Sequence, residues 1–270
     1  MKSLKLALLN IRKNIKNEKE LKSAFIISIV GMMLNNAAFI ILWYYFGKIV
    51  GELNGWKAED IFGLYAINTV SYGIVAGFLN GIFQIPTYIT TASLDRYLLT
   101  PKNILMKIST SKISTSAFGD LLYGIVCFVI FIFLRDLSIP QILFSILLMI
   151  ISTVIFYSFS VICMTLSFYM MDGKNVSEGF YGMFLSNSLY HGGAFTGVLR
   201  FLFIFIVPSL LLGAIPVELV NDFNLNKFLL LIVLAILWLL ISILFFKKSL
   251  KKYESNNLFG FGNWFQNLTI

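Results

Sequence analysis

Asp120 has the clearest capacity for chemistry in this sequence, because it is the only carboxylate that we place inside an apolar run long enough to cross a membrane. An acid at that depth is a candidate proton relay or cation contact. It lies within two turns of the basic end of its run, where water or Lys112 can reach it, which favours an interfacial structural role over proton coupling. Amides lie within or beside such runs at Asn35, Asn36 and Asn80. Amides at that depth most often bond between helices, and with Asp120 they form the candidate lining of a pathway.

The other reactive side chains form no catalytic or metal-binding pattern. His191 is the single histidine, and one histidine without a cluster of carboxylates cannot build a zinc site. Cys127 and Cys163 lie in apolar runs without metal-ligand spacing and are expected to pack as small hydrophobes. The sequence contains no G-x-x-x-x-G-K-[ST], H-E-x-x-H or G-x-S-G run. We therefore expect no enzyme, no metal and no cofactor bound by this chain.

The composition predicts an integral membrane protein. The chain has 270 residues, of which 58% are hydrophobic, and its mean hydropathy is +0.85. These values are too apolar for an ordinary water-soluble domain. The net charge of +8 does not indicate nucleic acid, because the basic residues are confined to particular loops.

The distribution of lysine and arginine predicts the orientation. Of 21 such residues, 17 fall in the segments 1–23, 86–112, 170–200 and 247–270. The other four occupy the alternate loops: Lys48, Lys57, Arg135 and Lys227. Cytoplasmic loops carry the excess of positive charge, so we expect a multi-pass protein of the cell membrane with both termini in the cytoplasm.

Residues 1–270 are expected to form one all-α domain with six membrane-spanning helices. The apolar runs place these at 25–46, 61–85, 113–134, 141–171, 195–214 and 228–246. Leu4, Leu8, Ile11 and Ile15 recur at helical spacing among basic residues, which predicts a helix over 1–23 in the membrane interface. The run PSLLLGAIPVELV is too short for another full span and too apolar for a solvated loop. It predicts a re-entrant outer hairpin before the last span.

The second span carries a row of small residues. Gly73, Gly77 and Gly81 recur every four residues, so they share one face of the helix. Small residues in this register let another helix approach closely. We expect this face to pack against a helix of the same chain or of a partner.

Residues 86–112 form the longest polar interruption between spans, and within them 93–112 has features of a small structured unit. Ser93 is placed to cap a short helix, Asp95 lies near the positive end of its dipole, and Pro101 ends it. Leu94, Tyr97 and Leu98 share one face by their spacing. A short amphipathic helix of this kind suits docking to a partner, and the alternative is an interfacial helix that seats the loop on lipid headgroups.

The stretch SLDRYLLTPKN resembles the loop motif of ABC-2 type export permeases, in the subgroup with a leucine-rich D-R-x-L-L-x-P signature. Thr100 stands where that subgroup has a basic residue. The resemblance extends to the span pattern, the amino-terminal helix and the re-entrant segment. It implies that the 86–112 loop couples the permease to a separate ATPase that binds the ATP. The residues that carry this role by resemblance are Leu94, Asp95, Arg96, Tyr97, Leu98, Leu99 and Pro101.

The resemblance implies a permease subunit of an ATP-driven exporter, working with a second permease, of the same or a paralogous chain, in the membrane lipid. One alternative is a secondary transporter or channel driven by an ion gradient, which the scarcity of intramembrane charge and the lack of a visible repeat disfavour. Another is a membrane scaffold, for which six spans with a glycine groove exceed what anchoring needs.

Overall fold

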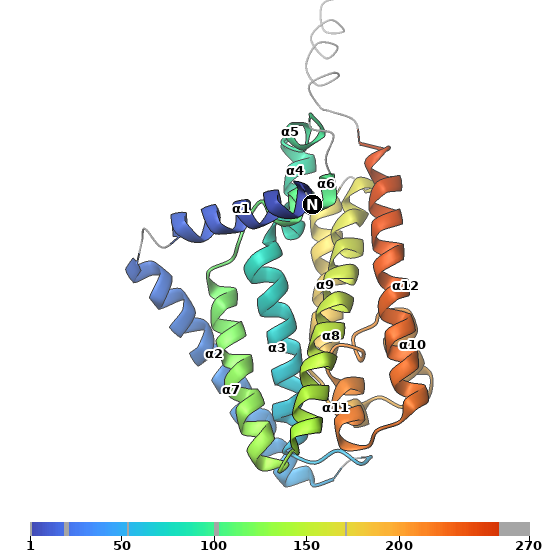
Figure 1. Ribbon diagram of the computed structural model, residues 1–270. Coiled ribbons are helices and arrows are strands. Elements are labelled where there is room, and N and C mark those ends of the chain that lie inside the picture. The colour runs from blue at the N-terminus through green and yellow to red at the C-terminus, as the bar shows by residue number, and fades with distance from the viewer. Residues whose placement is uncertain (1, 19–21, 53, 100–102, 171, 254–270) are drawn as a thin grey trace, which may run out of the picture.

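The apolar runs form long helices that pack side by side in one bundle (Figure 1). The computed structural model describes residues 2–18, 22–52, 54–99, 103–170 and 172–253, and the regular elements within these ranges are all helices. Five of the helices in this part of the chain are long and apolar enough to cross a membrane. They are α2 (Lys22–Val50), α3 (Asp60–Leu79), α7 (Ser116–Leu134), α8 (Ile139–Thr165) and α12 (Leu225–Leu250).

The outer faces of the bundle are apolar. Leu34 and Leu42 on α2 are 68% and 61% exposed, and Val233 and Leu244 on α12 are 60% and 65% exposed. α3 lies at the centre and is the most deeply buried of the five helices. Exposing such a continuous apolar surface to water is energetically unfavourable. This is therefore an integral membrane protein of the all-α class.

Shorter helices occupy the two ends of the bundle. α1 (Lys2–Glu18), α4 (Ile85–Thr90), α5 (Asp95–Leu98) and α6 (Ile104–Ser109) gather at one end, called here the α6 end. α10 (Gly197–Phe205) and α11 (Ala214–Asn221) lie toward the other, called the α11 end. α1 crosses the bundle almost at right angles to the long helices (Figure 1). Its residues Asn10 and Asn14 reach Thr110 at the end of α6, with Asn14 Nδ2 3.3 Å from the Thr110 carbonyl oxygen.

The predicted span at 195–214 is not a continuous helix. α10 has nine residues, about 14 Å of helix, which is less than half of a ~30 Å hydrocarbon core. Pro208 follows it and cannot donate a helical hydrogen bond, and Arg200 within it forms an ion pair with Glu218 of α11. α10 and α11 are thus two short helices with the buried turn 208–213 between them.

The segment that runs antiparallel to α8 is instead α9 (Gly173–Ser188) (Figure 1). Its buried face is made by Gly173, Ser177, Phe184 and Ser188. Phe184 packs against Phe159 of α8 with ring centroids 4.5 Å apart. Lys174, Glu178 and other polar residues make α9 more hydrophilic than the five long helices, and it is not among the helices long and apolar enough to cross a membrane.

Two predicted helix ends also differ in the structure. The second span was predicted to end at residue 85, but α3 continues through the 3₁₀ turn Asn80–Gln84 into α4, where Pro86 lies in the first turn. Proline is tolerated there because that N–H has no helical partner. The fourth span ends at Thr165 rather than 171, in the 3₁₀ turn Leu166–Phe168. It begins with a capping box in which Ser138 and Gln141 satisfy each other's backbone donors.

Glycines allow α3 and α7 to meet at backbone contact. A Cβ atom at Gly73 would lie 2.7 Å from the backbone nitrogen of Leu121, and one at Gly124 would lie 2.9 Å from that of Val70. Gly81 packs in the same way on α6. A Cβ at Gly77, by contrast, would meet only the Phe118 ring at 3.4 Å, an ordinary contact. The close approach is therefore within this chain and depends on Gly73 rather than on Gly77.

Gly73→Ala is expected to destabilise the bundle by about 1–3 kcal/mol, because the added methyl group would push α3 away from the α7 backbone. Gly77→Ala is the matched control and should leave stability nearly unchanged. Thermal unfolding of both variants in detergent measures the difference. Equal midpoints for the two variants would show that the α3–α7 contact does not limit stability.

Candidate functional site

A polar cavity lies between α2, α3, α7 and α9. Its volume is about 150 Å³, enough for several water molecules or a small head group. The polar side chains that line it come from three of these helices, and the apolar ones come mainly from α9 and the edge of α2. The lining comprises Met32, Asn36, Asn68, Thr69, Tyr72, Asp120, Leu185 and Leu189.

Asp120 is buried in this cavity, with 3% of its surface exposed. Asn36 Nδ2 donates to its Oδ1 at 2.6 Å, whereas Oδ2 has no hydrogen-bond partner. Lys112, the expected neighbour, donates instead to Gln84 Oε1 at 3.0 Å. Asp120 lies within two turns of the start of α7, as predicted, but Lys112 does not reach it, because Asp120 faces inward toward α2 and α3.

The other candidate lining residues do not join the cavity. Asn35 is exposed on the outer face of α2, and Asn80 is half-buried at the end of α3. Of the four amides and acids proposed from the sequence, only Asn36 and Asp120 lie together.

Sequence reasoning missed three cavity residues, namely Asn68, Thr69 and Tyr72. Asn68 is 3% exposed, and its Nδ2 donates to the carbonyl oxygens of Leu64 and Ser188, each at 3.0 Å. Because both partners are acceptors, the amide orientation is fixed and Oδ1 must face elsewhere. That oxygen has no partner. The available signal was the spacing of Asn68 and Tyr72, which places both on one face of α3.

Residues 93–99 at the α6 end, called here the coupling segment after the role predicted for them, are folded onto the rest of the chain. Leu94 is fully buried and Tyr97 is 6% exposed, whereas Leu98 and Leu99 are 40% and 84% exposed. The Tyr97 ring lies 5.2 Å from that of Tyr88. Leu94, Tyr97 and Leu98 were predicted to share one face. The chain itself covers Leu94 and Tyr97, and only Leu98 of the three remains exposed. The leucines of this segment that remain exposed are Leu98 and Leu99.

Charged side chains frame this segment. Arg96 is exposed and its guanidinium lies 5.0 Å from the centroid of the Tyr97 ring, with Lys107 of α6 5.4 Å from the same ring. Asp95 is half-buried. Ser93 does not cap α5, because Leu94 holds the N-cap position and the Ser93 hydroxyl pairs with that of Thr91 at 2.8 Å. Asn103 caps α6, accepting from Met106 N at 3.3 Å. Pro101 lies outside the described residues.

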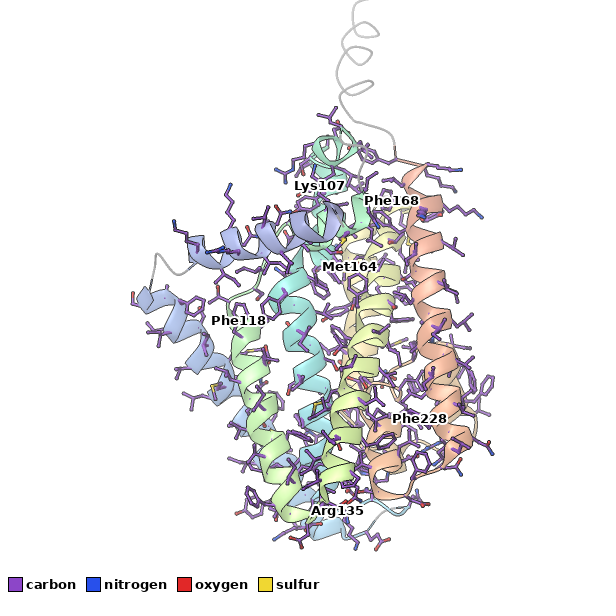
Figure 2. All side chains as sticks on the ribbon, in the orientation of Figure 1. Lys107, Phe118, Arg135, Met164, Phe168 and Phe228 are labelled. Atoms are coloured by element: carbon purple, nitrogen blue, oxygen red, sulfur yellow. The ribbon has the colours of Figure 1, made fainter. Side chains whose placement is uncertain are left out.

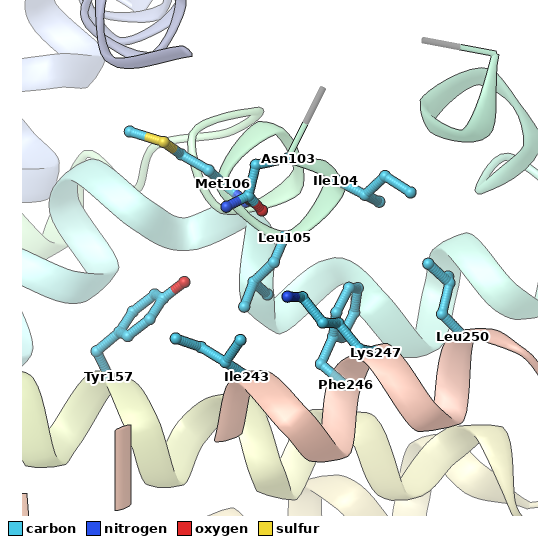
Figure 3. Close-up of a pocket in the computed structure, with 9 residues that line it drawn as sticks. All are labelled: Asn103, Ile104, Leu105, Met106, Tyr157, Ile243, Phe246, Lys247 and Leu250. Carbon is cyan, nitrogen blue, oxygen red and sulfur yellow. Dashed lines mark hydrogen bonds between the residues drawn. The ribbon is translucent and has the colours of Figure 1, made fainter. Parts of the chain in front are cut away.

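A second cavity of about 420 Å³ separates α6 from α12 (Figure 3). Leu105 of α6 points toward Phe246 and Lys247 of α12 across it. The Tyr157 hydroxyl at its edge is 2.9 Å from Ser109 Oγ. α6 thus packs against the 3₁₀ turn Asn80–Gln84, α1 and α5, is joined to α8 by this hydrogen bond, and borders the cavity on the side of α12.

At the α11 end, buried carboxylates are neutralised by ion pairs. Asp60 is fully buried, and its Oδ1 accepts from Arg135 Nε at 2.8 Å and from Asn221 Nδ2 at 2.9 Å. Figure 2 shows Arg135 at the end opposite Lys107. Together these contacts tie the start of α3 to the ends of α7 and α11.

A second carboxylate at this end is Glu218. It pairs with Arg200 at 2.7 Å and with Lys227 at 3.0 Å. Arg200 therefore lies at the same end of the bundle as Arg135 and Lys227. Its grouping with the basic segments 1–23, 86–112 and 247–270 is wrong. The large excess of positive charge at the α6 end persists without it.

His191 lies beside Trp56, and burial lowers its pKa, so it is neutral near pH 7.

The apolar exterior and the five long helices define a multi-pass membrane protein, and its bundle encloses a cavity that contains a buried carboxylate. The model of the ABC-2 family transporter proteins matches residues 32–257, and the chain belongs to this family. No curated protein matches the chain in a sequence comparison. The chain is thus the membrane component of an ABC-2 type transporter.

Arg135→Leu is expected to cost about 3 kcal/mol of stability, because it leaves the Asp60 carboxylate buried without its counter-charge. Adding Asp60→Asn should restore most of the loss, since a neutral amide needs no ion pair. Unfolding midpoints of the single and double variants in detergent provide the measurement. A double variant no more stable than Arg135→Leu would contradict the role assigned to this pair.

Proposed function

We propose that the chain is the permease subunit of an ATP-driven exporter of the cell membrane, coupled to ATPase subunits on separate polypeptides. The observation that carries the proposal is the family match over 32–257, which includes the coupling segment and its exposed leucines. ATP would bind to the partner subunits. The substrate pathway would lie between this permease and a second one, of the same or a paralogous chain.

The exposed pair Leu98 and Leu99 supports ATPase docking. Both leucines project from a segment held in place by buried Leu94 and Tyr97. Apolar side chains on such a fixed support can fill a groove on a partner with little loss of conformational entropy. Arg96 beside them would form the polar rim of the contact.

The cavity between α6 and α12 supports a coupling motion. Coupling requires an element with two arrangements that nucleotide can bias. α6 borders about 420 Å³ of space and lies in the segment between α3 and α7. A shift of α6 toward α12 would transmit the movement of the ATPase to α3 and α7, the two helices that flank this segment.

The exposed faces of α2 and α12 support assembly with a second permease. Asn35 on α2 is an amide that faces outward at membrane depth. A neighbouring helix can bond this amide, whereas lipid cannot. With α9 as the sixth pass, the basic α6 end would lie in the cytoplasm and α10 and α11 would form the outer re-entrant hairpin.

A transporter driven by an ion gradient is the second candidate, and buried Asp120 is the observation that favours it. Reconstituted vesicles with the ATPase separate the two. Transport that needs ATP and persists without an ion gradient supports the exporter, and the reverse supports the second candidate.

Replacing Leu98 and Leu99 together with alanine should reduce affinity for the ATPase by at least tenfold, because exposed apolar anchors contribute most of the energy of such contacts. Leu8 and Leu9 on α1 form the matched control, at 61% and 54% exposed. Their replacement should leave ATPase affinity unchanged. Copurification and stimulated ATP hydrolysis provide the readouts, and equal loss from both pairs would refute docking at α5.

Reporter insertions test the orientation of the passes. A reporter beside Lys174 should lie in the cytoplasm, whereas reporters beside Asn54 and Gly197 should both lie outside. The reason is that α9 separates Lys174 from Gly197. If the reporters beside Lys174 and Gly197 were on the same side, α9 would not be a membrane pass.

A further inference from the structure

The cavity between α2, α3, α7 and α9 presents hydrogen-bond acceptors that nothing in the described protein satisfies. Asp120 Oδ2 and Asn68 Oδ1 are both buried without a partner. No lysine or arginine that the structure describes forms an ion pair with Asp120. A buried acceptor without a donor costs about 1–3 kcal/mol, and more when it is charged. The site therefore favours an occupant that donates hydrogen bonds.

Most of the donors already present are committed to other acceptors, and the Tyr72 hydroxyl is a further donor that lines the cavity. Asn68 uses both hydrogens of its amide on Leu64 and Ser188, and Asn36 donates to the other oxygen of Asp120. The Thr69 hydroxyl donates to the carbonyl oxygen of Tyr65 at 2.7 Å. The cavity thus contains a carboxylate without a counter-charge among the described residues, and the neutral Tyr72 hydroxyl can donate a hydrogen bond but cannot balance that charge.

The remaining lining is apolar. Met32, Leu185 and Leu189 form part of the wall, and α2, which bounds the cavity, is the least buried of the five long helices. A third cavity of about 490 Å³, lined almost entirely by apolar and aromatic side chains of α2, α3 and α7, lies farther along α2. A molecule with a small polar head and an apolar body suits these surroundings better than a free ion does.

We propose that this cavity binds the protonated amine head group of an amphipathic molecule, with Asp120 Oδ2 and Asn68 Oδ1 as acceptors. An ammonium group provides up to three N–H donors and the positive charge that Asp120 lacks. If the proposed function holds, on which this extension rests, primary amines with an apolar tail are the class of substrate that the exporter carries. Water alone is the competing occupant.

The test uses the full chain in phosphatidylcholine nanodiscs, without nucleotide or ATPase. Octylammonium, octyltrimethylammonium, octanol and octanoate are titrated at pH 7, and the unfolding midpoint is followed, because a ligand that binds the folded state raises it. Octylammonium is expected to raise the midpoint most. The trimethyl compound has the charge without N–H donors and should raise it less, and the alcohol and the acid least.

Asp120→Asn removes the charge with little change of shape and should weaken octylammonium binding at least tenfold. Thr165→Val on α8 is the control, since Thr165 lies outside the cavity and its buried hydroxyl donates only to the carbonyl oxygen of Val161, and its affinity should stay within twofold of the wild type. Octylammonium binding that survives Asp120→Asn overturns the proposal. An equal response of the wild type to octylammonium and octanol also overturns the proposal, and it is the result expected if the cavity holds only water. This comparison does not depend on the folding of any variant.

This binding experiment and ATPase docking fail independently. Loss of docking with retained ammonium selectivity would leave the binding site and remove the exporter. Loss of ammonium selectivity with retained docking would leave the exporter and remove this substrate class.

Discussion

Hydrocarbon cannot form a hydrogen bond with a carboxylate or an amide, so each polar group inside this bundle must find a partner in the protein or in a bound molecule. Asp60 meets this constraint through Arg135 and Asn221. Asp120 meets it at only one carboxylate oxygen, because Asn36 donates to Oδ1 and Oδ2 has no partner. The contrast separates the α11 end, where charges join helices together, from the central cavity, where an acceptor is kept available.

α3 connects these regions. Asp60 begins the helix, Asn68 and Tyr72 line the cavity at its middle, and Gly73 holds it against α7. Through α4 the same chain segment continues to α5 and the exposed Leu99. In the proposed exporter, a force applied at α5 would therefore reach the cavity along one continuous segment packed on α7.

Most of the spans could be predicted because long apolar runs have few other stable forms in a membrane. The helix α9 could not be predicted, because its sequence includes Lys174 and Glu178 and its burial comes from aromatic packing around Phe184. Helical spacing correctly grouped Leu94 with Tyr97, but spacing does not reveal which face the chain itself covers. Asn68 was missed because its spacing to Tyr72 shows only that the two share a face of the helix, and its role depends on helices distant in sequence.

The central claim is that the α6 end of this permease receives an ATPase at α5. A photo-crosslinking amino acid in place of Leu99, introduced in the intact membrane, tests it directly, with Leu240 on the exposed face of α12 as the control position. The claim predicts an adduct at position 99, but not at 240, with a polypeptide whose peptides contain the nucleotide-binding G-x-x-x-x-G-K-[ST] run. Crosslinking of position 99 to lipid alone would contradict it and would make α5 a membrane-seated helix.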